Sequence, residues 1–222
     1  MDHQEIKRVE AITLDVGGTL IDPWPSAGHV YAEVAATHGF DGISPELLNR
    51  QFAAAWQTKS AFDYSRSSWC EMVTLTFQGI CAAHQVEQFF APLYARFEQT
   101  DVWRLHPDVL PALEFFRERR IRLAVISNWD ERLRGLLSRL GIATYFEAII
   151  VSGEIGFHKP APEIFQAALR QLDLPGNRVL HIGDHPVEDV EGARAMGINA
   201  FKVSRGSASA AASLLTIAKD WL

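Results

Sequence analysis

Seven polar side chains lie where apolar segments of the sequence give way to turns. The apolar run 11–14 ends at a carboxylate and two glycines, and the run 122–126 leads into a serine and an asparagine. A lysine precedes a proline-led segment at 162, and the run 178–182 is followed by two carboxylates. Singly, such residues are ordinary in turns and helix caps, but together they favour an active site. These side chains are Asp15, Thr19, Ser127, Asn128, Lys159, Asp184 and Asp189.

This set of side chains suits phosphoryl transfer. Asp15 can attack phosphorus to form an aspartyl-phosphate, which water then hydrolyses. A hard divalent cation, held by Asp15, Asp184 and a backbone carbonyl, offsets the repulsion between carboxylate and phosphate. Lysine and hydroxyl groups bind the remaining phosphoryl oxygens. We therefore expect a magnesium-dependent site for a small phosphorylated substrate.

The elements that position these residues alternate along the chain. Helical periodicity over 107–120, 130–140, 162–172 and 187–196 alternates with short apolar runs at 122–127, 147–151, 178–182 and 200–203. A short helix is also expected over 214–221. Alternation of this kind is typical of right-handed βαβ units. It predicts an α/β fold with a parallel sheet, covered by helices on both faces, whose strand ends carry the polar residues.

A helical block interrupts this pattern just after the first strand. Residues 26–98 carry helical spacing, and Ser44 followed by Pro45 is a strong helix start. We therefore expect a core formed by residues 1–22 and 104–222, with residues 23–103 inserted as a helical cap. The cap is rich in aromatic residues, most of which we assign to its own core.

Composition limits the partners. The chain has 222 residues, 48% of them hydrophobic, and a formal net charge of -6. This charge argues against nucleic acid or an acidic membrane surface as the main partner. An apolar leader or an apolar run long enough to span a membrane is not evident, and two cysteines fit a reducing compartment. We expect a cytoplasmic protein, and leave open whether it is a monomer or a dimer.

The motifs resemble those of the haloacid dehalogenase superfamily of phosphatases and related hydrolases, over essentially the whole chain. Asp15 and Thr19 match the first motif and Ser127 the second. Lys159 matches the third, and the pair Asp184 and Asp189 the fourth. Segments 127–133 and 30–35 are similar to a narrower branch whose substrates are poorly defined.

The resemblance implies a Rossmann-like core, a Mg²⁺ cofactor and a helical cap. It implies catalytic roles for Asp15, Ser127 and Lys159, with Thr19, Asn128 and Lys159 binding the phosphate. The metal would be held by Asp15, the backbone carbonyl of Gly17 and Asp184. Asp189 would serve either as a ligand or through a contact to one.

Gly17 departs from the family pattern. Most phosphatases of the superfamily carry at this position an aspartate that protonates the leaving group and then activates water. Loss of a general acid/base typically costs roughly 10²–10⁴ in rate, and less when the leaving group is already a weak base. The favoured interpretation is a phosphatase restricted to good leaving groups, or one using His158, His185 or Asp22 as the acid. A binding or regulatory protein with little turnover is the main alternative, and a 2-haloacid dehalogenase is a further one.

Overall fold

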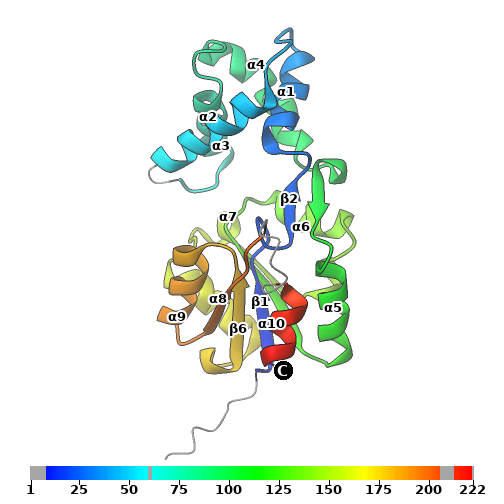
Figure 1. Ribbon diagram of the computed structural model, residues 1–222. Helices are drawn as coiled ribbons and strands as arrows, with labels where there is room; N and C mark the ends of the chain where they lie inside the picture. The colour runs from blue at the N-terminus through cyan, green and yellow to red at the C-terminus, as the bar shows by residue number, and fades with distance from the viewer. Residues whose placement is uncertain (1–8, 60–61, 206–212, 222) are drawn as a thin grey trace, which may run out of the picture. The chain divides into compact units, whose positions relative to one another are not determined.

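The chain divides into two compact units. The computed structural model describes residues 9–59, 62–205 and 213–221. Unit 1 comprises Met1–Ile21 and Leu105–Leu222, and unit 2 comprises Asp22–Arg104 (Figure 1). Where the chain passes between the units, strands β2 (Ile21–Pro23) and β3 (Trp103–Leu105) pair in a two-stranded sheet.

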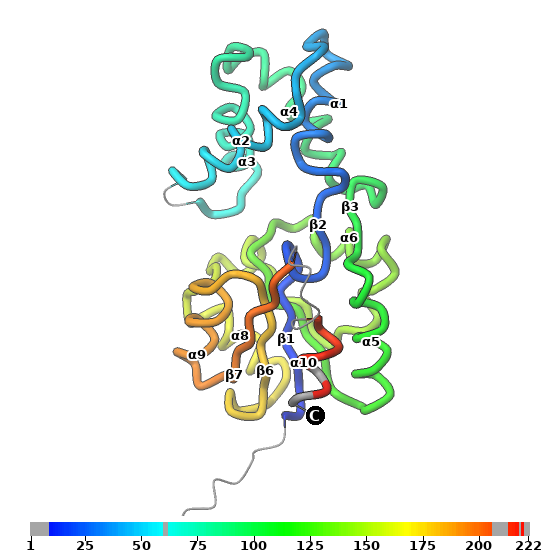
Figure 2. The backbone as a smooth tube through the Cα atoms, in the orientation of Figure 1, coloured from blue at the N-terminus to red at the C-terminus, as the bar shows by residue number. Residues whose placement is uncertain are grey.

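Unit 1 is built on a five-stranded parallel sheet. Its strands lie in the order β5-β4-β1-β6-β7 (Figure 2). Because the chain first adds strands on one side of β1 and then returns to add β6 on the other, the direction of winding reverses between β1 and β6. Ligands in open α/β sheets bind outside the carboxyl ends of the strands at such a reversal. The strand bounds are Ala11–Leu14 (β1), Arg122–Ser127 (β4), Ala148–Val151 (β5), Val179–Gly183 (β6) and Asn199–Lys202 (β7).

Helices cover both faces of this sheet, so the predicted α/β fold class is confirmed. Helix α8 packs against β4 and β5, while α5 contacts β4 and α10 (Figure 1). The α-helices are α5 (Val109–Glu118), α6 (Arg132–Arg139), α7 (Ser152–Ile155), α8 (Pro162–Leu172), α9 (Gly192–Ala195) and α10 (Leu214–Trp221). Single 3₁₀ turns at Ala143–Tyr145 and Gly176–Arg178 precede β5 and β6.

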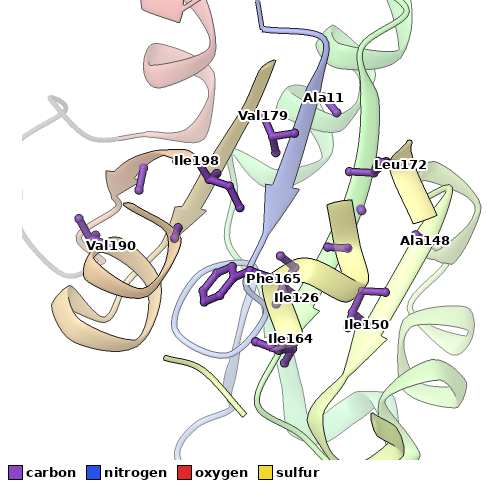
Figure 3. Close-up of a cluster of buried hydrophobic side chains, with 14 residues drawn as sticks. Ala11, Ile126, Ala148, Ile150, Ile164, Phe165, Leu172, Val179, Val190 and Ile198 are labelled. Atoms are coloured by element: carbon purple, nitrogen blue, oxygen red, sulfur yellow. The ribbon is translucent and has the colours of Figure 1, made fainter. Parts of the chain in front are cut away.

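A hydrophobic cluster fills the space between the sheet and α8. Alternate residues of each strand point to this face, and Ile164 and Phe165 of α8 pack against Ile126 and Ile150 (Figure 3). The same alternation places Thr13 of β1 and His181 of β6 on this face, paired in register. Both side chains are fully buried. Two polar groups therefore lie among otherwise apolar core residues.

The predicted helix over 187–196 is confirmed, but its first part is not α-helical. The segment Pro186–Glu191 is a π-helix, and only Gly192–Ala195 is α-helical. At Gly192 a Cβ would lie 2.9 Å from Phe165 and 3.0 Å from Pro160, so this segment approaches its neighbours too closely for any larger residue. Because a π-helix has a wider turn than an α-helix, Asp189 lies back against Gly183. A Cβ on residue 183 would lie 2.2 Å from the Asp189 side chain.

Unit 2 is a helical bundle with an aromatic core. Ser44 Oγ accepts a hydrogen bond from the Leu47 amide at 3.2 Å, and Pro45 is the first helical residue, as the sequence predicts. Phe77 packs between Tyr31 and Phe89 inside the bundle. The centroid of its ring lies 6.2 Å from that of Tyr31 and 5.1 Å from that of Phe89. The helices are α1 (Ala27–Ala36), α2 (Pro45–Thr58), α3 (Arg66–Thr76) and α4 (Ala83–Arg96), followed by a 3₁₀ turn at Thr100–Val102.

Two further sequence expectations concern this unit and the chain as a whole. Cys70, on α3, and Cys81, in the turn before α4, are free thiols, and both are half-buried. Within the described ranges, every helix is too short or too polar to cross a membrane.

Candidate functional site

The end of β1 delivers Asp15 into a tight turn. The Ile21 amide donates to the Val16 carbonyl at 3.0 Å, and the Gly18 amide donates to the Ile21 carbonyl at the same distance. This turn brings Thr19 back toward the strand end, where its Oγ1 donates to Asp15 Oδ2 at 3.0 Å. Asp15 is 6% exposed, so its carboxylate lies in an almost dry site.

Lys159 joins two of the predicted carboxylates. Its Nζ lies 2.7 Å from Asp15 Oδ1 and 2.5 Å from Asp189 Oδ1. All three side chains are buried, and Lys159 itself is 2% exposed. A buried ammonium is stable only when its charge is paired and its protons are hydrogen-bonded, and the two carboxylates meet both needs. The sequence places these residues at one sheet edge, and the structure brings them into direct contact.

A buried histidine, which the sequence analysis missed, extends this network. His181 Nε2 lies 3.1 Å from Asp189 Oδ1, and His181 Nδ1 lies 2.9 Å from Thr13 Oγ1. The His185 amide donates to the other oxygen of Asp189 at 2.9 Å. Asp189 is therefore held from three directions. Polar residues at matching positions of two apolar strands were the available signal, because Thr13 and His181 each interrupt a run of buried hydrophobic residues.

Asn128 holds the segment that carries Lys159. Its Oδ1 accepts from the Lys159 amide at 2.6 Å, and its Nδ2 donates to the Lys159 carbonyl at 3.0 Å. Nδ2 also donates to Glu188 Oε2 at 2.9 Å. Both amide protons are thus used inside the protein. The neighbouring Ser127 is buried, and its Oγ lies 3.4 Å from Asp15 Oδ1, which places this predicted residue beside the carboxylate.

Burial and charge act against each other on the ionisation of this cluster. Burial, together with the Asp189 and Asp184 carboxylates, raises the pKa of Asp15 to about 6, although the Lys159 ammonium opposes the shift. Burial also raises the pKa of Asp184. Burial alone would raise the pKa of Asp189, but Lys159 and His181 outweigh it and hold that pKa well below its usual range. The pKa of Lys159 is raised, since the carboxylates outweigh the effect of its burial.

The carboxylates fit a hard divalent cation. Asp15, Asp184 and Asp189 each offer an oxygen, and these oxygens all lie within 4.8 Å of one another. Three carboxylates face one ammonium, and oxygen ligands are those that Mg²⁺ prefers. At Gly18, which has a φ of 75°, a Cβ would lie 2.6 Å from Asp184 Oδ2. Only glycine allows this carboxylate to approach the Asp15 turn so closely.

The three side chains predicted as substitute acids are placed differently. His185 is exposed, and its Nδ1 accepts a hydrogen bond from the Glu188 amide at 3.1 Å. It therefore caps the Pro186–Glu191 segment through its Nδ1 atom. His158 is exposed beside Lys159, and Asp22 belongs to unit 2.

Comparison with known proteins agrees with these motifs. A model of the haloacid dehalogenase-like hydrolases matches residues 9–197. The human haloacid dehalogenase-like hydrolase domain-containing protein 3 is 34% identical over 207 residues, covering 88% of this chain and 82% of that protein. Phosphoserine phosphatase of Thermus thermophilus is also 34% identical, covering 89% of this chain and 90% of its own.

Structural similarity extends over the same length. A putative β-phosphoglucomutase of Thermotoga maritima superposes with a TM-score of 0.76 at 22% identity, covering 96% of this chain and 100% of that one. This likeness concerns the fold. This human relative belongs to the branch of the superfamily that segments 127–133 and 30–35 resemble. Because the family match spans most of the chain and contains every residue of the cluster, the chain belongs to the haloacid dehalogenase-like hydrolases.

Proposed function

We propose that this hydrolase is a Mg²⁺-dependent phosphatase in which Asp15 is the nucleophile. The observation that carries the proposal is the buried contact of Asp15 with Lys159 at 2.7 Å, beside two more carboxylates within 4.8 Å. With a pKa of about 6, Asp15 is mostly ionised at neutral pH and available for attack. The similarity to a phosphoserine phosphatase supports a small phosphorylated substrate.

Two displacements at phosphorus make up the proposed reaction. A carboxylate oxygen of Asp15 forms a bond to phosphorus while the bond to the leaving-group oxygen breaks, and that oxygen departs with the electron pair. Water then attacks the aspartyl-phosphate and gives up a proton to solvent, the bond between phosphorus and Asp15 breaks, and inorganic phosphate leaves with the carboxylate restored. Lys159 donates hydrogen bonds to phosphoryl oxygens during both steps, and the hydroxyls of Thr19 and Ser127, which contact the Asp15 carboxylate here, would turn to those oxygens when substrate binds.

The acidic residues are proposed to hold the cation. Asp15, Asp184 and the Gly17 carbonyl would ligate Mg²⁺, and Asp189 would orient Lys159 and the neighbouring ligands. When bound, the cation offsets the repulsion between carboxylate and phosphate. Asn128 is assigned to holding the Lys159 segment, because both of its amide protons are already used there. We propose that unit 2 is the expected cap and that it contributes to the choice of substrate.

Phosphate release is the direct test. With Mg²⁺, the protein is expected to hydrolyse acetyl phosphate and p-nitrophenyl phosphate, and Asp15→Asn is expected to lose roughly 10³-fold or more in kcat. Added EDTA should abolish the wild-type activity. No phosphate from either substrate, in a folded protein that binds Mg²⁺, would contradict the proposal.

A non-catalytic binding or regulatory protein is the second candidate, and Gly17 is the observation that favours it. Glycine provides no side chain to protonate a leaving group. This candidate predicts that the transition-state mimic orthovanadate binds with Mg²⁺ while no substrate is turned over. Release of chloride from 2-chloropropionate in EDTA would instead support the dehalogenase alternative.

A further inference from the structure

Gly17 and Gly18 are adjacent glycines held by different constraints. Gly18 has a positive φ and lies against Asp184, so its backbone excludes other residues. Gly17 has no such backbone constraint, because its φ lies outside the left-handed range. A side chain at residue 17 would meet Trp129, because Cζ3 of Trp129 lies 3.2 Å from the position that a Cβ on residue 17 would occupy. Ordinary van der Waals contact begins near 3.4 Å.

The backbone of Trp129 is fixed. Ser152 Oγ lies 3.0 Å from both the amide and the carbonyl of Trp129, and the Gly153 amide donates to the same carbonyl at 2.9 Å. The next residue, Asp130, is fully buried and pairs with Arg132 at 2.5 Å. This loop therefore cannot retreat from residue 17. A side chain at residue 17 therefore meets the half-buried indole itself.

We infer that Trp129 is a specificity-determining residue that occupies the place of the missing acid. This inference rests on the proposed phosphatase function. The indole places an apolar ring beside residue 17, where a proton donor would serve the leaving group. A site of this kind favours phosphates whose leaving groups depart as weak bases, which are acyl and aryl phosphates, over phosphates of ordinary alcohols. Gly17 and Trp129 thus form one coupled feature, although they lie far apart in the sequence.

The first test measures this packing and needs no turnover. Gly17→Ala adds only a Cβ, and Trp129→Ala removes the ring that it would meet. We measure the change in Tm that Gly17→Ala causes. This change is expected to be about 2–4 °C more favourable in the Trp129→Ala background than in the wild type. Gly135→Ala is the matched control, since its Cβ would meet the flexible end of Arg139 at 3.1 Å. That control should show no coupling to Trp129.

The second test measures leaving-group dependence. Gly17→Asp supplies a carboxyl group at residue 17, and its turnover of glycerol phosphate is the reference for this test. Gly17→Asp combined with Trp129→Ala should raise it by about tenfold or more, which is part of the gain that a positioned acid supplies. The ratio of p-nitrophenyl phosphate to glycerol phosphate turnover should fall in parallel, a change that loss of stability alone does not produce.

The outcomes separate the two proposals. Full recovery of glycerol phosphate turnover by Gly17→Asp with Trp129 intact would overturn the inference, as would the absence of coupling in the Tm cycle. If the wild type releases no phosphate even from acetyl phosphate, the phosphatase proposal fails and the specificity role fails with it. The Tm cycle would then report only whether Trp129 excludes a side chain from residue 17.

Discussion

The two units bury opposite kinds of side chain. Among the described residues, buried charged groups occur in unit 1, and most of them meet at the ends of β1, β4 and β6. In unit 2 the buried polar side chain of the described part is Thr76, which simply donates to the Met72 carbonyl of its own helix. Unit 2 otherwise buries aromatic rings against one another. Burying a charged side chain costs free energy unless the charge is paired and hydrogen-bonded, whereas burying aromatic rings stabilises the fold directly.

The same contrast exists inside unit 1 between two ion pairs of equal length. Lys159 Nζ lies 2.5 Å from Asp189 with side-chain exposures of 2% and 1%. Arg122 Nη2 lies 2.5 Å from Glu147 with exposures of 37% and 45%. Distance alone does not distinguish them, but burial does, because solvent screens the second pair and not the first.

The largest expected effect comes from removing the buried ammonium. Lys159→Met leaves the Asp15 and Asp189 carboxylates facing each other in a dry site. We expect a loss of about 3–5 kcal/mol in the free energy of unfolding without Mg²⁺, partial recovery when Mg²⁺ is added, and at least roughly 10³-fold lower kcat. Urea unfolding with and without Mg²⁺ measures the first two effects, and phosphate release the third.

Arg122→Met is the matched control for that variant. Its exposed pair with Glu147 should contribute less than about 1 kcal/mol, with no Mg²⁺ dependence. If Lys159→Met were as mild as Arg122→Met, the distinction between buried and exposed charge in unit 1 would be wrong.

An aromatic deletion in unit 2 is expected to affect stability and not the chemistry of Asp15. Phe77 is fully buried between Tyr31 and Phe89, so Phe77→Ala should cost about 3–5 kcal/mol. Well below the unfolding temperature, Mg²⁺-dependent hydrolysis of acetyl phosphate should remain within about tenfold of the wild type. A loss of turnover comparable to that of Asp15→Asn would show that the bundle core supports catalysis directly.

A smaller effect is expected from the buried pair of Thr13 and His181. Thr13→Val leaves one ring nitrogen of His181 without its partner and should cost about 1–3 kcal/mol. In a His181→Leu background the same substitution should cost much less, because that nitrogen is gone. Unfolding in urea measures this cycle, and additive losses would mean that the 2.9 Å contact contributes nothing.

The smallest expected effect is a pH dependence in unit 2. Hydrogen bonds to the Asp63 carboxylate from the Ser65 hydroxyl, from Ser68 Oγ at 2.7 Å and from the Ser65 amide at 2.9 Å lower the pKa of Asp63 to about 2. A lowered pKa stabilises the fold above the unfolded-state value near 4, and this stabilisation is lost as the pH falls toward about 2. The Tm difference between wild type and Asp63→Asn should therefore narrow over that interval. A difference independent of pH would contradict the assignment.

Much of unit 1 follows from local pattern. The strand over 122–127 and the short terminal helix over 214–221 lie where the sequence predicts them, because apolar runs and helical spacing are local signals. The π-helix at Pro186–Glu191 was not predictable, since it depends on the close approach of Gly192 to Phe165 and Pro160. Tyr64 shows the same limit in unit 2. It directly precedes the polar residues 65–68 in the sequence, yet it is 4% exposed and packs against Phe62 at 5.0 Å between ring centroids.

By itself, the sequence determined which groups reach one sheet edge. Asp15, Lys159 and Asp184 each follow or precede a segment whose type is set by local spacing, and parallel strands place such ends together. Only the tertiary structure decided which partners those groups bind and how deeply they are buried. It enclosed Lys159 between two carboxylates, bonded His181 to Thr13 across neighbouring strands, and placed the Trp129 ring against Gly17. These contacts join residues far apart in the chain, and their strength depends on the exclusion of water and on distances of a few tenths of an ångström.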